Sequence, residues 1–216
     1  MQLTARRGHF LAFLALLLIF GSVSAYTALR HAAGDLASLK ARSQIERWQR
    51  DARLKPQIRD IGQARNALVK AIERTPDDPG LHENLAYLYG LRALMARSLP
   101  ELEHAMLDEV LTHSRMAGAR RPMAPYAWAN IAMALHRKSE DPVAMWAALD
   151  RALAYGRREG GVQIRVAGII LARWDEAGIE RQTDLRNMLL NSRGRAAKQL
   201  RQMLDSAGRQ DLLPQG

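Results

Sequence analysis

The hydrophobic residues follow a three-and-four spacing along most of this chain, which is the spacing of helices with one buried face. Ala64, Leu68 and Ala71 show it, and Leu85 and Ala86 resume it after a break rich in proline and aspartate. Alanine and leucine make up 66 of the 216 residues, whereas valine, isoleucine and threonine, which favour strands, supply only 21. The pattern and the composition therefore predict an all-α protein.

The first thirty residues contain a long apolar stretch. Residues 10–29 carry no charged side chain, and a helix of this length reaches about 30 Å, the thickness of the hydrocarbon core of a bilayer. We therefore expect residues 1–30 to be a transmembrane anchor or an uncleaved signal segment. The alternatives are a secretory signal cleaved after Val23-Ser24-Ala25 and an apolar helix buried in the core.

Basic residues lie on both sides of this stretch. Arg6 and Arg7 precede it and favour a cytoplasmic amino terminus, whereas Arg30, Lys40 and Arg42 follow closely and count toward the opposite orientation. Because the stretch also has the features of an export signal, we expect the rest of the chain to be exported. The expected location is the bacterial inner membrane, with one span and a periplasmic soluble part.

Residues 31–56 have the composition of a charged juxtamembrane helix or linker. The apolar residues Leu36, Leu39, Ile45 and Trp48 form a stripe among alternating arginines and acids. Charged helices of this kind usually face solvent, so we interpret the segment as a stalk between membrane and domain. Contact with anionic lipid headgroups is the alternative.

Residues 57–206 have the spacing of stacked helical hairpins. Small, large and small residues on one helix are followed by Pro76 and then by Leu85, Ala86 and Tyr89 on the next helix. This order agrees with the 34-residue tetratricopeptide repeat, in which two helices pack as a hairpin. The segment therefore predicts a tetratricopeptide-like domain, which is a special case of packed helical hairpins.

A search for repetition extends this prediction. The segments PGLHENLA and PYAWANIA share proline, asparagine and alanine at an offset of 46 residues. This offset exceeds one repeat by about a dozen residues, which predicts a long helix within 99–118. We expect two to three degenerate hairpins, with 143–156 as the partner helix of the second. The last helix or helix pair, 180–206, is expected to cap the array, and 207–216 to be a tail.

The charge balance is strongly basic. There are 27 arginines and 5 lysines against 22 acids, a net charge of +10, which suggests anionic partners. The aromatic residues lie on the apolar helical stripes rather than between exposed arginines, and this argues against nucleic acid as the partner. The candidate anion-binding surface is the outward face of the last helix, formed by Arg193, Arg195, Lys198 and Arg201.

The sequence contains no constellation that we can assign to catalysis. Cysteine is absent, and there is no phosphate-binding glycine loop and no Gly-x-Ser-x-Gly elbow. Glu101 and His104 resemble half of a di-iron motif, which needs two such pairs and two further carboxylates. An enzyme that uses Glu101, His104 or Glu109 is a third hypothesis. Our prediction is a protein without enzymatic activity, cofactor, metal or small-molecule substrate.

One motif is similar to a known family. The segment RPMAPYAWA (121–129), the downstream segment GVQIRVAGIILARWDE (161–176) and the single N-terminal span resemble the VpsP-type family of bacterial polysaccharide-biosynthesis proteins. The resemblance covers most of residues 60–190 and implies an accessory, non-enzymatic role in making or exporting an exopolysaccharide. From the residues alone, Pro125 suits a helix start and Trp128 a core position. The functional alternative is a partner-docking edge formed by Arg121, Pro125, Tyr126 and Trp128.

These observations predict a membrane-anchored scaffold or adaptor of the bacterial cell envelope. The concave face of the stacked helices would receive a helix or an extended segment of a partner. The expected partners are other envelope proteins, among them the polysaccharide synthesis or export machinery. The alternative is an envelope module whose basic helices bind anionic polysaccharide or lipid directly.

Overall fold

The fold is that of a computed structural model, which describes residues 2–51 and 53–213, with side chains from residue 13 onward. Every regular element in this part of the chain is helical, which confirms the all-α prediction. The elements are α1 (Gln2–Arg50), α2 (Ile58–Arg74), α3 (Pro79–Met95), α4 (Pro100–Arg120), α5 (Pro125–Lys138), α6 (Pro142–Gly156), α7 (Gly160–Ala172), α8 (Gly178–Asn191), α9 (Gly194–Ser206) and the short 3-10 helix η1 (Gln210–Leu212). They form two compact units, Met1–Asp77 and Asp78–Gly216.

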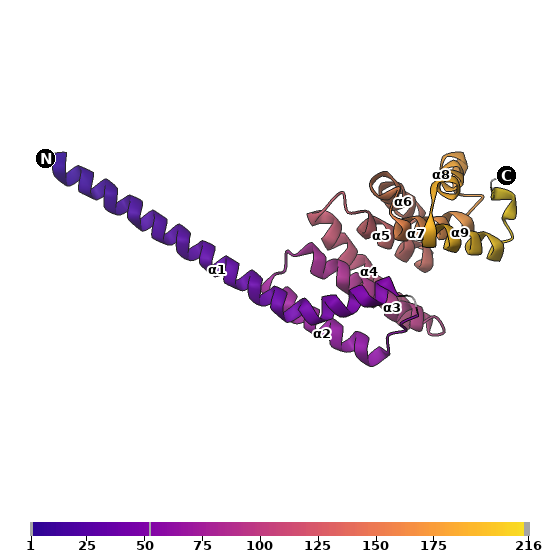
Figure 1. The fold of residues 1–216 in the computed structure, drawn as a ribbon, viewed down its shortest axis with the longest axis horizontal. Helices are drawn as coiled ribbons and strands as arrows, with labels where there is room; N and C mark the ends of the chain where they lie inside the picture. Colours follow the sequence, from indigo (N-terminus) through magenta and orange to yellow (C-terminus); the bar gives the residue numbers. More distant parts are fainter. Residues whose placement is uncertain (1, 52, 214–216) are drawn as a thin grey trace. The chain divides into compact units, whose positions relative to one another are not determined.

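The first unit begins with an apolar helix that continues without interruption into a charged one (Figure 1). The large apolar side chains between Phe13 and Leu29 are exposed, and Phe20 is 74% exposed. Exposure of so many apolar side chains is unfavourable in water and favourable in lipid. α1 therefore has the length and composition of a membrane span, which are also those of a signal sequence.

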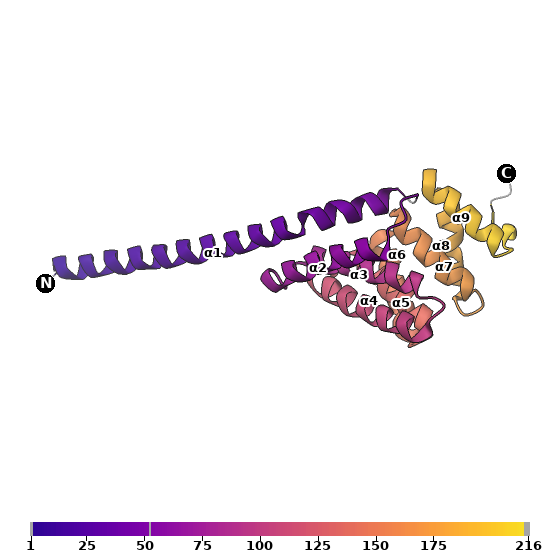
Figure 2. The same cartoon turned by 90° about the horizontal axis from the view of Figure 1, so that it is seen from below.

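The charged half of α1 packs against α2 as a helical hairpin (Figures 1 and 2). The buried face of α1 consists mainly of small residues: Gly34, Ser38, Ala41 and Ile45. The two backbones are so close that a Cβ on Gly34 would lie 3.0 Å from Oγ1 of Thr75. Much of the segment 31–56 is therefore paired with α2. The compact unit that contains it extends to Asp77, beyond the predicted boundary at residue 57.

The predicted apolar stripe of α1 is correct for Ile45 and wrong for Leu36 and Leu39. Ile45 is fully buried, whereas Leu36 is 75% exposed and Leu39 is 61% exposed. Gly34 and Ala41 each lie two residues from one of these leucines, which is about 200° around a helix. Because small residues let two backbones meet, α2 packs on the small face and the leucines lie on the opposite side.

The second unit folds as successive hairpins. α3 packs on α4, α5 packs on α6, and α7 packs on α9 and α8, while α5 also contacts α4 and α7. This arrangement confirms the prediction of hairpin packing in this part of the chain. α4 has 21 residues and is the longest helix of the unit, in agreement with the long helix expected between the two similar segments.

Proline begins four consecutive helices of this unit. The residues are Pro79, Pro100, Pro125 and Pro142. Proline has no N–H to leave unpaired in the first turn, and its φ is already helical. Two aspartates complete these starts: the N–H of Gly80 donates to Asp78 at 2.7 Å, and the N–H of Ala144 donates to Asp141 at 2.9 Å. These helix starts are therefore determined locally by the sequence.

α5 is short and rich in alanine, and other helices pack closely around it. Six of its 14 residues are buried: Ala127, Ala129, Ile131, Ala132, Ala134 and Leu135. Such small side chains allow α4, α6 and α7 to approach its backbone. The tightest approach is at its start, where a Cβ on Gly156 would lie only 2.5 Å from the Cβ of Pro125.

The predicted capping segment is a pair of helices, α8 and α9. Leu185, Met188, Leu200 and Leu204 are buried on these two helices. The chain beyond α9 forms the turn of η1, and Leu212 is buried in the core, so the predicted tail contributes to the fold. Residues 214–216 of that tail lie outside the described residues.

Two histidines meet between α3 and α4. The Nδ1 atoms of His82 and His113 lie 2.9 Å apart, and the ring of Tyr89 stacks on His113 with the centroids 5.6 Å apart. Burial, together with the neighbouring His82, lowers the pKa of His113 to about 4. Burial also lowers the pKa of His136 on α5. His113 and His136 are therefore neutral in the folded unit at pH 7.

We predict that Gly156→Ala destabilises the second unit by about 1–3 kcal/mol, because the new methyl group overlaps Pro125 and there is little room for it to move. The matched control is Gly90→Ala in the middle of α3, where no atom lies within 4 Å of an added Cβ. That variant should gain about 0.5–1 kcal/mol from its lower chain entropy. Urea unfolding followed by tryptophan fluorescence measures both, and equal changes in the two variants would contradict the packing argument.

We also predict that stability falls between about pH 6.5 and about pH 4 through His113. In this window the unfolded chain binds the proton that folded His113 does not, so acidification favours unfolding. The loss should be about 1–2 kcal/mol once partial solvation is allowed for. The unfolding free energy of His113→Asn should depend less steeply on pH than that of the unsubstituted protein. Parallel curves for the two proteins would show that the histidine pair has no such effect.

Candidate functional site

A pocket of about 280 Å³ opens among α3, α4, α5 and α7, and we call it the inner pocket. Its apolar lining is formed by Ala86, Gly90, Leu91, Leu94, Leu107, Val110, Met133 and Ala134. Leu94 is 48% exposed and offers its side chain to solvent. The volume is near the lower end of the range for small-molecule cavities, about 300–1,000 Å³. The inner pocket therefore suits one or two side chains of a partner better than a large cofactor.

Arg165 brings a positive charge to the inner pocket. It is partly buried, because it lies within the apolar helix α7. Its Nη1 donates to the carbonyl oxygen of Gly161 at 3.0 Å, and its guanidinium carbon lies 5.7 Å from the ring centroid of Tyr126. Within the described part of the chain, no carboxylate forms an ion pair with it.

Two tyrosines are titratable neighbours of Arg165, and one of them, Tyr126, is hydrogen-bonded to Glu159. Burial lowers the pKa of Arg165, and Tyr126 and Tyr87 oppose this effect. Burial also raises the pKa of both tyrosines, so they remain neutral phenols at pH 7. Among the described residues, the guanidinium of Arg165 is therefore in contact with one carbonyl oxygen and the ring of Tyr126 but forms no ion pair.

The other polar residues that line the inner pocket are Tyr87, Arg97, Asn130 and Arg137, and none of the described residues that line it is acidic. Arg137 forms an ion pair with Glu103 of α4 and donates to the carbonyl oxygen of Ala93 at 3.3 Å. Its charge is thus balanced within the unit. Arg97 is exposed and adds a second cation at the pocket. The site combines apolar walls with excess positive charge.

The four predicted docking residues make different contacts in the structure. Arg121 is exposed and reaches Glu83 of α3, with Nη1 and Oε1 4.0 Å apart. Pro125 is packed against Gly156. Tyr126 is 39% exposed and lies against α7, where it is in contact with Gly161 and Arg165. Of the four, Tyr126 is therefore the one next to the inner pocket.

Trp128 has a structural environment. Its Nε1 donates to the carbonyl oxygen of Pro122 at 2.7 Å, and the guanidinium of Arg151 on α6 lies 4.5 Å above its ring. Its ring also packs against Gly118 of α4. These contacts join the α4–α5 turn to the hairpin, and they agree with the expected core role of this residue.

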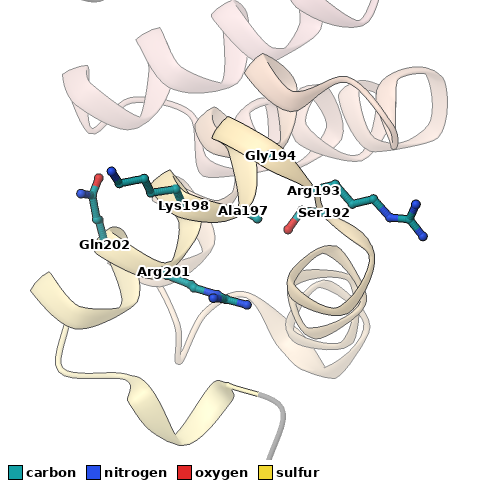
Figure 3. Close-up of a pocket in the computed structure, with 7 residues that line it drawn as sticks. All are labelled: Ser192, Arg193, Gly194, Ala197, Lys198, Arg201 and Gln202. Carbon is teal, nitrogen blue, oxygen red and sulfur yellow. The ribbon is translucent and has the colours of Figure 1, made fainter. Parts of the chain in front are cut away.

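The predicted anion-binding residues lie on and before α9, around a shallow hollow of about 510 Å³ (Figure 3). Arg193, Lys198 and Arg201 line it, and Arg195 is exposed nearby. Figure 3 shows Lys198 pointing to one side of α9 and Arg193 to the other. The charges therefore form a dispersed basic surface rather than a cluster around one point.

The acidic and histidine residues of the third hypothesis are also dispersed. Glu101 and His104 are exposed on α4, and Glu109 lies 3.9 Å from Nε2 of His113. Among the described residues, no three His, Asp or Glu side chains gather into a set that could hold a metal ion.

Two features of this unit were not predicted from the sequence. The first is Arg165, although a single arginine within the apolar run GVQIRVAGII was a visible signal. The second is the pair of His82 and His113, which are 31 residues apart and meet only because α3 and α4 fold back on each other. No sequence pattern signals the second feature.

Comparison with models of known protein families gave no match, and comparison with curated proteins gave none. The resemblance to the VpsP-type family thus remains a hypothesis based on its two segments.

Proposed function

We propose that this protein is a single-pass scaffold of the bacterial cell envelope. α1 anchors it in the inner membrane, and the unit Asp78–Gly216 binds another envelope protein in the periplasm. The observation that carries this proposal is the inner pocket. It is an apolar depression among α3, α4, α5 and α7, it is open to solvent, and Leu94 lies at its rim. A pocket of this kind accepts anchor side chains of a helix or an extended segment.

The proposal includes a tetratricopeptide-like arrangement of the second unit. In it, α3 with α4 and α5 with α6 are the first two repeats, and α7 begins a third that α8 and α9 close. Support comes from the spacing of Pro76, Leu85 and Ala86 and from hairpin contacts between consecutive helices. In such arrays each hairpin packs on an apolar face of the next, and the stacked hairpins together form a long binding surface.

The proposed process is synthesis or export of an exopolysaccharide, in which the protein has an accessory, non-enzymatic role. This part rests on the resemblance of RPMAPYAWA (121–129) and of residues 161–176 to the VpsP-type family. The alternative is direct binding of anionic polysaccharide or lipid by the basic surface of α9. The exposed positions of Arg193, Lys198 and Arg201 support that alternative.

We predict that alkaline phosphatase fused after Gly216 is active in cells, because this enzyme folds only outside the cytoplasm. The protein should stay in the membrane fraction after alkaline extraction, and its mass should include residues 1–25. A control that lacks residues 13–29 should be inactive and soluble. An inactive fusion would contradict export, and a soluble product that begins at Tyr26 would identify the apolar stretch as a cleaved signal.

We further predict that Leu94→Glu abolishes function without unfolding the unit. Leu94 is half exposed, so the substitution costs little stability, but it puts a charge where an apolar side chain of the partner binds. The matched control is Leu190→Glu on α8, a residue that is 62% exposed and outside the inner pocket. The assay is the amount of secreted polymer in a strain that lacks the gene and expresses each variant.

The expected result is restoration by the unsubstituted protein and by Leu190→Glu, with a loss for Leu94→Glu. Restoration by all three would contradict a role of the inner pocket. A variant with Arg193, Lys198 and Arg201 all replaced by Gln separates the alternatives. If this triple variant fails to restore the polymer and Leu94→Glu restores it, the basic surface of α9 is the binding site and the inner pocket is not.

A further inference from the structure

Several partly buried arginines of the second unit have carboxylate partners. Arg137 pairs with Glu103, Arg181 makes two bonds of 2.7 Å to Asp150, and Arg173 lies 2.8 Å from Glu176. Such pairing offsets much of the free-energy cost of moving a charge out of water. In these three arginines a carboxylate of the same unit balances the charge.

Arg165 differs from them. It has a carbonyl oxygen and an aromatic ring as neighbours but no carboxylate partner among the described residues. Of its five N–H donors, one bonds to Gly161, and the planar fork of a guanidinium matches a carboxylate in geometry. The missing partner is therefore best supplied from outside the chain.

We infer that the inner pocket binds an acidic segment of a partner protein, in which Glu or Asp side chains flank leucine-like side chains. A carboxylate of this segment binds the guanidinium of Arg165, and an apolar side chain enters among Leu91, Leu94 and Met133. Arg97 offers a second cation for a further acid. This inference deepens the proposed scaffold role and rests on it for the partner being an envelope protein.

The dimensions and charge of the inner pocket both favour this occupant. About 280 Å³ holds one or two side chains, and the described residues that line the pocket include arginines but no acid. Apolar contact provides the affinity for such a segment, whereas charge complementarity selects it among other segments and speeds its encounter. A neutral segment would leave the guanidinium of Arg165 desolvated and without a carboxylate.

The competing explanation is that Arg165 is a structural clamp, which joins α7 to α5 through Gly161 and Tyr126. The two explanations predict opposite changes in stability. Replacement of a clamp weakens the fold. If Arg165 is instead a ligand-binding cation, its replacement removes an uncompensated charge. The fold without ligand is then as stable as before or more stable.

The test uses the full chain in detergent micelles and two probe peptides, acetyl-Glu-Leu-Leu-Glu-amide and its neutral isostere acetyl-Gln-Leu-Leu-Gln-amide. Titration calorimetry measures binding, and a thermal melt measures Tm. We expect the acidic peptide to bind at least about tenfold more tightly than the neutral one. Arg165→Met should abolish this preference with Tm unchanged or raised. The control Arg201→Met on α9 should keep both the preference and the Tm.

Three outcomes would overturn the inference: equal binding of the two peptides, a preference that survives Arg165→Met, or a preference that Arg201→Met removes. If Arg165→Met lowers Tm and binding together, Arg165→Lys decides, because it keeps the charge without the planar fork. A retained preference for the acidic peptide in that variant supports the inference, and its absence overturns it. These measurements need no living cell, so they can fail or succeed independently of the polymer assay.

Discussion

The close contact between Pro125 and Gly156 sets how near α5 and α6 can lie, and much of the second unit depends on that distance. With no side chain on Gly156 and alanines along α5, the helices around α5 come close enough for α7 to pack beside it. This places Tyr126 against Gly161 and brings Arg165 to the inner pocket. The candidate site thus follows from backbone proximity that larger residues would prevent.

The first unit uses the same principle at another contact. Gly34, Ser38 and Ala41 let α1 meet α2 closely, and the larger residues Leu36 and Leu39 turn away from the interface. In both units the size of the side chains, rather than their hydrophobicity alone, selects which face of a helix is buried. α1 is therefore both the apolar helix suited to a membrane and half of a packed hairpin.

The basic character of the chain is unevenly distributed. Residues 1–77 contain 13 arginines and lysines and 6 acids, whereas residues 78–216 contain 19 and 16. The second unit is thus close to neutral, and many of its arginines are in ion pairs. In this nearly neutral unit, three arginines and, among the described residues, no acid line the apolar inner pocket. The net charge of +10 gives no indication of where the inner pocket lies.

The sequence by itself determined the helical class, the apolar N-terminal stretch and most helix boundaries. These depend on local physics: residue periodicity, the prolines that begin α3 to α6, and the caps Asp78 and Asp141. It also indicated the buried face of α2, because Ala64, Leu68 and Ala71 lie on one side of that helix. Only the tertiary structure decided which face of α1 is buried, that His82 meets His113, and that no described carboxylate pairs with Arg165. Each of these depends on which residues distant in the sequence come close in space, and the spacing along one helix contains no information about its neighbour.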